Sequence, residues 1–197
     1  MKTKHTLFLL PFLSAGSLLA QTASDDAGNY TTWNDGSNEG SGFADWSLNQ
    51  TSDGTTTFAG HFLGNSTDGA GDLNTGSQSF GMFANPVGAS ATAIRSFATP
   101  LTTNDQFSFQ MGVNFNNGNK GFNLRSGGDE IFNFNVGGGA PGASVNSSDP
   151  ATTLVPDTGN YDYGGNDAVL DITLVVKSAS EIDYQISRAS EQGIQGT

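Results

Sequence analysis

The chain has 197 residues, of which 35% are hydrophobic, 27 are glycine and none is cysteine. Nineteen acidic and seven basic side chains give a net charge of −12, which repels phosphate groups and argues against binding of nucleic acid. The absence of cysteine excludes thiol catalysis, disulfides and cysteine-based metal sites.

Residues 1–20 have the pattern of a secretory signal peptide. Lys2 and Lys4 supply a positive start, Leu7 to Leu19 form a short apolar stretch, and small residues follow it. Since a bilayer span needs about 20 apolar residues, we expect no membrane span after the signal is removed. We predict a protein that is secreted or held at the cell surface, with 21–197 as a single domain.

Aromatic side chains lie in polar, glycine-rich segments of the chain. Tyr30 and Trp33 follow the signal, and Tyr161 and Tyr163 belong to the long irregular segment 137–166. Exposed aromatic rings can stack on sugars, so these four are our candidate carbohydrate-binding residues. Packing in the core is the alternative for each of them.

Three short strands are expected in the first half of the chain, at 58–63, 78–84 and 91–97. His61, the only histidine after the signal, lies in the first of them. Alternation places it on the face opposite Phe58 and Phe62, so we expect it to face solvent or the other surface of the sheet. In a Ser-His-Asp triad, His61 would be the only available histidine base. We expect a structural or incidental role for His61.

A glycine-rich loop after the first of these strands carries possible calcium ligands. Asp68, Asp72 and Asn74 are spaced at i, i+4 and i+6, and Ca²⁺ takes six to eight oxygen ligands, including backbone carbonyls. A second such loop spans 157–167, with Asp157, Asp162 and Asp167. Ordinary Asx turns are the alternative in both loops.

Alternation of apolar and polar residues is strongest between 105 and 136. It predicts a three-stranded antiparallel meander, with turns at 116–119 and 126–128. Residues 170–186 predict a further hairpin. Residues 191–197 are expected to add no closing strand, which indicates either a C-terminally truncated chain or closure of the sheet by the N-terminal segment.

These patterns predict an all-β fold. We expect an antiparallel β-sandwich of the jelly-roll type, similar to concanavalin and other lectins, with aromatic side chains facing inward.

Four segments resemble a group of secreted bacterial proteins. They are 25–30 (DDAGNY), 42–48 (GFADWSL), 78–85 (QSFGMFAN) and 93–97 (AIRSF). The likeness is to proteins of Verrucomicrobia and Planctomycetes, many of which have a PEP-CTERM sorting tail, and it covers most of 25–188. It implies a secreted or surface-associated β-rich domain and supplies no catalytic residues. The sequence departs from that pattern because no Pro-Glu-Pro motif, apolar span or basic tail follows residue 188.

Acidic residues could support glycosidase chemistry, which needs two carboxyl groups roughly 5–10 Å apart. Asp129, Glu130, Asp171 and Asp183 lie in or beside the predicted strands, but none belongs to a catalytic motif, so we expect solvated surface acids.

Our leading hypothesis is an exported, non-catalytic β-sandwich module that binds an extracellular glycan, with Ca²⁺ as its only expected cofactor. The alternatives are a secreted glycan-active hydrolase of the same jelly-roll fold, and a structural or adhesin module whose partner is another protein.

Overall fold

The structure is a computed structural model that describes residues 23–64, 78–112, 118–136, 143–147, 152–153, 169–188 and 191–196. These residues form twelve β-strands and one turn of 3-10 helix, η1 (Ala27–Asn29), and every strand pair among them is antiparallel. The predicted all-β, antiparallel fold is confirmed. The predicted signal peptide lies outside the described residues, within which no helix has the length and apolar character to cross a membrane.

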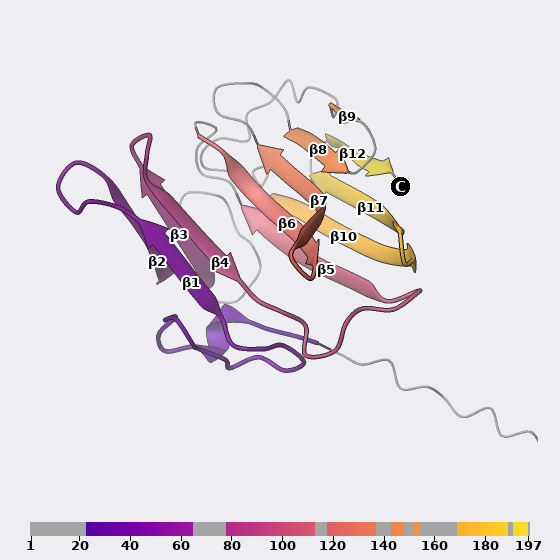
Figure 1. Cartoon of the computed structure of the whole chain (residues 1–197), viewed down its shortest axis with the longest axis horizontal. Helices are drawn as coiled ribbons and strands as arrows, with labels where there is room; N and C mark the ends of the chain where they lie inside the picture. The colour runs from indigo at the N-terminus through magenta and orange to yellow at the C-terminus, as the bar shows by residue number, and fades with distance from the viewer. Residues whose placement is uncertain are drawn as a thin grey trace, which may run out of the picture.

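The first four strands form two pairs. β1 (Ser47–Thr51) pairs with β4 (Ser90–Ile94), and β2 (Phe58–Gly64) pairs with β3 (Ser79–Asn85). The pairs lie side by side (Figure 1) and are joined where His61 Nε2 lies 2.9 Å from the carbonyl oxygen of Thr92. The three short strands predicted in this region are therefore confirmed, although the third ends at Ile94, and β1 was not expected.

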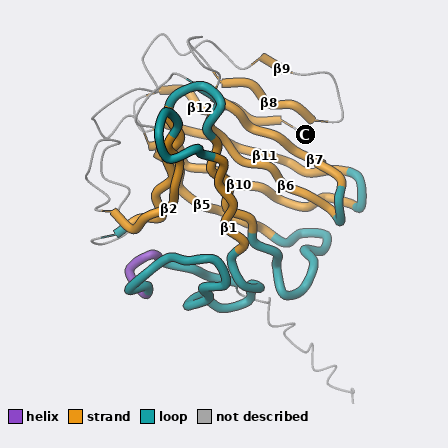
Figure 2. The backbone as a smooth tube through the Cα atoms, turned by 60° about the vertical axis from the view of Figure 1, so that its left-hand side comes forward, coloured by secondary structure: helices purple, strands orange, loops and turns teal. Residues whose placement is uncertain are grey.

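The remaining strands form two four-stranded sheets, ordered β12-β11-β10-β5 and β6-β7-β8-β9. Their bounds are β5 (Gln106–Gly112), β6 (Lys120–Ser126), β7 (Asp129–Val136), β8 (Ala143–Ser147), β9 (Thr152–Thr153), β10 (Val169–Ser178), β11 (Glu181–Arg188) and β12 (Glu191–Gly196). Figure 2 shows η1 and its neighbouring loops at one end of the molecule, below β1 and β2.

The predicted meander over 105–136 is wrong. β6 and β7 form the expected hairpin, but β5 pairs with β10 in the other sheet. β5 and β6 instead meet through their apolar faces, where the ring centroids of Phe109 and Phe122 are 4.8 Å apart. Alternation identifies which side chains share a face of a strand, but it does not identify the strand that pairs with its edge.

The C-terminal part of the chain contains the predicted hairpin. β10 pairs with β11, with Ile172 opposite Ile186 and Leu174 opposite Tyr184. The expectation that 191–197 adds no strand is wrong, because β12 pairs with the outer edge of β11. A polar and glycine-rich sequence hid this strand, since an edge strand needs no strong apolar face.

In the described part of the chain, a hydrophobic core takes its buried members from both four-stranded sheets. Its buried members are Phe132, Phe134, Leu170, Ile172, Leu174, Tyr184 and Ile186. Both sheets contribute, and the rings of Phe132 and Tyr184 meet across them with centroids 5.1 Å apart. Burying each such side chain stabilises the fold by about 1.5–3 kcal/mol.

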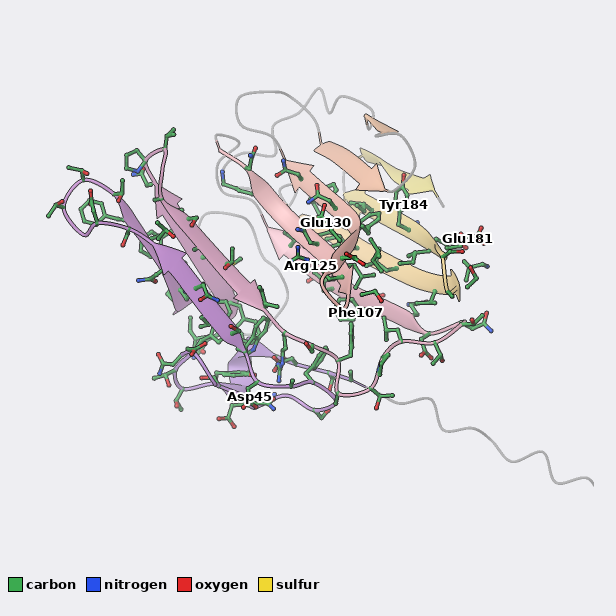
Figure 3. All side chains as sticks on the ribbon, in the orientation of Figure 1. Asp45, Phe107, Arg125, Glu130, Glu181 and Tyr184 are labelled. Atoms are coloured by element: carbon green, nitrogen blue, oxygen red, sulfur yellow. The ribbon has the colours of Figure 1, made fainter. Side chains whose placement is uncertain are left out.

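The N-terminal segments join this core through aromatic contacts at β5. Phe107, labelled in Figure 3, lies with its ring centroid 5.1 Å from that of Phe97 and 6.3 Å from that of Phe43. The first four strands are thereby connected to the larger sheets by packed side chains as well as by the chain itself.

Candidate functional site

Exposed aromatic side chains gather on one face of the β2–β3 pair. Phe58 and Phe62 share a face of β2 because they are four residues apart, and Phe83 joins them because it lies opposite Gly60. All three are about half-exposed. We call the surface formed by Phe58, Phe62 and Phe83 the Phe face.

Glycines on the opposite strand determine how two of these rings lie. A Cβ atom on Gly81 would be 2.3 Å from Cζ of Phe62, and one on Gly60 would be 2.9 Å from Cε1 of Phe83. Each ring therefore occupies the space that a side chain would take on the residue directly across the pair. The backbone supports one side of each ring, and 47% of Phe62 and 48% of Phe83 remain exposed.

The two rings form a continuous surface. Their centroids are 6.3 Å apart and their planes are inclined by 48°. Polar groups lie at both ends of the Phe face, because Asn85 is opposite Phe58 and Ser79 is opposite Gly64. Such a surface offers apolar stacking in its middle and hydrogen bonding at its ends.

The other face of β2 points inward, so His61 has the second of its two expected placements, on the surface of the sheet opposite Phe58 and Phe62. Its ring is half-buried and lies edge-on to the indole of Trp33, with centroids 5.4 Å apart. Ala59, two residues earlier on the same face, is buried. The contacts of His61 are those of a packing residue, and the phenylalanines that share its strand are the exposed ones.

For Tyr30 and Trp33, core packing, the alternative to sugar binding, is what the structure shows. Only 2% of Tyr30 and 5% of Trp33 are exposed, so neither ring offers a face to a sugar. Both contact Phe80, with centroid distances of 5.1 Å and 4.8 Å. Their glycine-rich segment folds inward because these rings bury a large apolar area against Phe80 and Trp46.

The remaining predicted site residues cannot be placed. Tyr161 and Tyr163 lie outside the described residues, as do Asp68, Asp72 and Asn74 of the first calcium loop. The second calcium loop, 157–167, lies outside them as well. Within the described part of the chain, no group of three or more His, Cys, Asp or Glu side chains could hold a metal ion.

A polar cluster around a buried ion pair lies beside the buried aromatic rings. Asp25 Oδ2 accepts hydrogen bonds from Arg95 Nη1, from Tyr30 Oη at 3.0 Å and from Trp46 Nε1 at 3.3 Å. Arg95 Nη2 donates to Asn38. We call these five residues the Arg95 cluster; its internal bonds compensate the cost of burying two charges.

Stacking completes the environment of the guanidinium group. The Cζ atom of Arg95 lies 4.7 Å from the ring centroid of Phe43 and 5.1 Å from that of Trp46, and its Nε donates to the carbonyl oxygen of Ala44 at 2.7 Å. Segments 25–30, 42–48, 78–85 and 93–97 meet around this cluster, with Phe80 as the contribution of the third. The residues of these segments thus have a packing role here.

The acids that we considered for catalysis lie on polar strand faces and have other partners. Asp171 accepts a hydrogen bond from Gln110 at 2.8 Å, and Asp183 lies 3.3 Å from Lys177. Asp183 is opposite Val175, four residues along β10 from Asp171, so the two acids are about 13 Å apart along the strand. Glycosidase pairs are roughly 5–10 Å apart, so these two do not form one.

Asp129 and Glu130 begin β7 in the other sheet. Glu130 accepts a hydrogen bond from Asn123, which in turn accepts one from Asn133. Arg125 is opposite Glu130 in the hairpin, and Figure 3 labels both. This polar face of β6 and β7 is occupied by bonds among its own side chains.

The loop before β2 is held by one carboxylate. Asp53 Oδ1 accepts hydrogen bonds from the backbone N–H groups of Thr55, Thr56 and Thr57 at 2.7–2.9 Å. A hydrogen bond from the Thr56 hydroxyl, and after it these backbone bonds, hold the pKa of Asp53 far below its ordinary value. These hydrogen bonds end at Thr57, and β2 begins at the next residue, Phe58.

Comparison with protein-family models, with curated protein sequences and with solved structures finds no match to this chain.

Proposed function

We propose that this protein is an exported, non-catalytic β-sandwich module that binds an extracellular glycan on its Phe face. The observation that carries the proposal is the placement of Phe62 and Phe83, each supported by a glycine on one side and exposed on the other. Contiguous exposed apolar patches mark binding surfaces, whereas single exposed apolar side chains are common on any protein surface.

The chemistry of sugars suits such a surface. One face of a pyranose ring presents C–H groups, which stack on an aromatic ring, while its hydroxyl groups project at the edge. Covering the exposed half of one phenylalanine removes roughly 90 Å² of apolar surface from water, worth about 2 kcal/mol before the costs of binding are subtracted. Asn85 and Ser79 provide hydrogen-bonding groups at the ends of the Phe face.

The sandwich architecture is supported by the shared core of the two four-stranded sheets, whose facing side chains form one cluster. The jelly-roll topology and the export of the protein are parts of the proposal that rest on the sequence, through its strand pattern and its predicted signal peptide.

The non-catalytic assignment is supported by the candidate acids. Asp171 and Asp183 are too far apart for a glycosidase pair. Glu130 lies on the other four-stranded sheet, where it accepts a hydrogen bond from Asn123. None of these carboxylates lies on the Phe face.

The test is a polysaccharide pull-down with residues 21–197. We expect binding by the wild type. Phe62→Ala and Phe83→Ala each remove one stacking ring, and we expect each to lower the affinity roughly tenfold, which corresponds to a lost binding free energy of about 1.4 kcal/mol. Met82→Ala is the matched control, since Met82 is also half-exposed but lies opposite His61 on the other face of the pair.

The proposal is refuted if no polysaccharide is retained, or if Met82→Ala weakens binding as much as the two phenylalanine variants do. Circular dichroism of each variant confirms that its strands are intact.

A further inference from the structure

We infer that the ligand of the Phe face is a neutral, linear polysaccharide that lies along the β2–β3 pair and contacts all three rings. This inference rests on the proposed function and specifies its substrate class.

The three rings form a row along the strands. Phe58 and Phe62 are separated by four residues of β2, which corresponds to about 13 Å. Phe83 lies opposite Gly60, midway between them. A row of this length exceeds one sugar ring, so a chain of linked sugars can contact every phenylalanine at once, whereas a single terminal sugar contacts one.

The surface between the rings carries little that would obstruct a chain. The positions that share the Phe face are Phe58, Gly60, Phe62 and Gly64 on β2, and Ser79, Gly81, Phe83 and Asn85 on β3. The rings of Phe62 and Phe83 lie over Gly81 and Gly60, the side-chain oxygen of Gln50 also approaches at Gly60, and the other positions, apart from the third ring, carry only glycine, serine or asparagine. An extended polymer can therefore lie on this face without entering a pocket.

The charge of the surface selects against acidic polymers. Strands β1 to β4 contain no Lys, Arg, Asp or Glu, and their one histidine, His61, is on the opposite face, so no cationic side chain of these strands lies on the Phe face to pair with a carboxylate or sulfate group. The net charge of −12 repels an acidic polysaccharide at a distance. A neutral polymer encounters neither obstacle, and it can use stacking and hydroxyl contacts alone.

Affinity electrophoresis in native gels tests the substrate class. The neutral probes are hydroxyethyl cellulose, soluble β-1,3-glucan, xylan and mannan, and the acidic probes are alginate and polygalacturonate, all at low and at high salt. We expect at least one neutral polymer to retard the wild type tenfold more strongly than either acidic polymer, with no effect of salt on that retardation.

A chain-length series tests the row of rings. Calorimetric titration with oligosaccharides of the retarding polymer, from one to six sugars, is expected to show at least a tenfold rise in affinity with length. Phe58→Ala is expected to lower affinity for the longest oligosaccharide more than for the disaccharide, because Phe58 is at one end of the row and a short ligand can still contact the other two rings.

The outcomes separate the two claims. Preferred binding of acidic polymers, or equal affinity for mono- and hexasaccharides, overturns this inference and leaves glycan binding intact. No retardation by any polymer overturns both. Self-association that Phe62→Ala abolishes, in the absence of any glycan binding, would assign the Phe face to a second copy of the chain and also overturn both.

Discussion

Replacing Arg95 by alanine should destabilise the protein more than any surface substitution. Its side chain is 5% exposed and that of Asp25 is 10% exposed, so the substitution leaves a buried carboxylate without its cation. Removing one partner of a buried ion pair costs about 3–5 kcal/mol. Since Tyr30 and Trp46 still donate to Asp25, we expect the lower end, about 3 kcal/mol. For a chain of this length, that lowers Tm by roughly 6–12 °C.

The chain contains a matched control for this experiment. Lys177 and Asp183 form an ion pair at 3.3 Å whose side chains are 45% and 41% exposed, and Lys177→Ala should cost about 0–1 kcal/mol. Arg95→Lys should fall between the two, because an ammonium group retains the charge but loses the planar fork and its stacking.

Urea unfolding followed by tryptophan fluorescence is the appropriate assay. The chain has two tryptophans; Trp46 belongs to the Arg95 cluster, and the ring of Trp33 lies 5.3 Å from it. The reasoning is refuted if Arg95→Ala lies within about 1 kcal/mol of the wild type, or if Lys177→Ala is equally destabilising.

Three other outcomes are expected. Gly81→Val places a side chain where the ring of Phe62 lies, so glycan affinity should fall about tenfold in a pull-down, while Gly128→Ala, in open space, should have no effect. EDTA should leave glycan retention unchanged, because the Phe face has no carboxylate; lost retention would move the site to the predicted calcium loop 68–74. Burial raises the pKa of Tyr184 above 10.0, so the folded state holds this proton more tightly than the unfolded state does. The free energy of unfolding should therefore fall as pH rises above about 10, and it should fall less steeply in Tyr184→Phe, as measured by urea titrations at pH 8 to 11.

Local pattern was sufficient where the pairing was local. The β10–β11 hairpin follows from alternation on both sides of a short polar turn, and each of its buried residues could be named from the sequence. The same argument failed for β5, because its partner β10 comes after a long intervening segment. A strand in a meander and a strand that crosses to another sheet show the same alternation of apolar and polar residues. Which strand pairs with β5 depends on how all the apolar faces pack together in the core.

The candidate site shows the same division. The pattern Phe58-Ala59-Gly60-His61-Phe62 defines two faces, and glycines at 60 and 81 were a signal that rings could lie across the pair. The choice of exposed face was not local. Trp33, from a polar, glycine-rich segment for which the sequence left both sugar binding and packing open, packs against His61 and thereby buries that side of β2.

Composition and alternation by themselves determined that this acidic, cysteine-free chain forms antiparallel β-structure with an aromatic core. They did so because these properties depend on neighbouring residues and on totals. Tertiary structure alone decided that Arg95 and Asp25, far apart in sequence, share a buried ion pair, and that the Phe face is open. Both depend on which surfaces meet after the chain has folded, and burial is a property of the partner surface as much as of the residue itself.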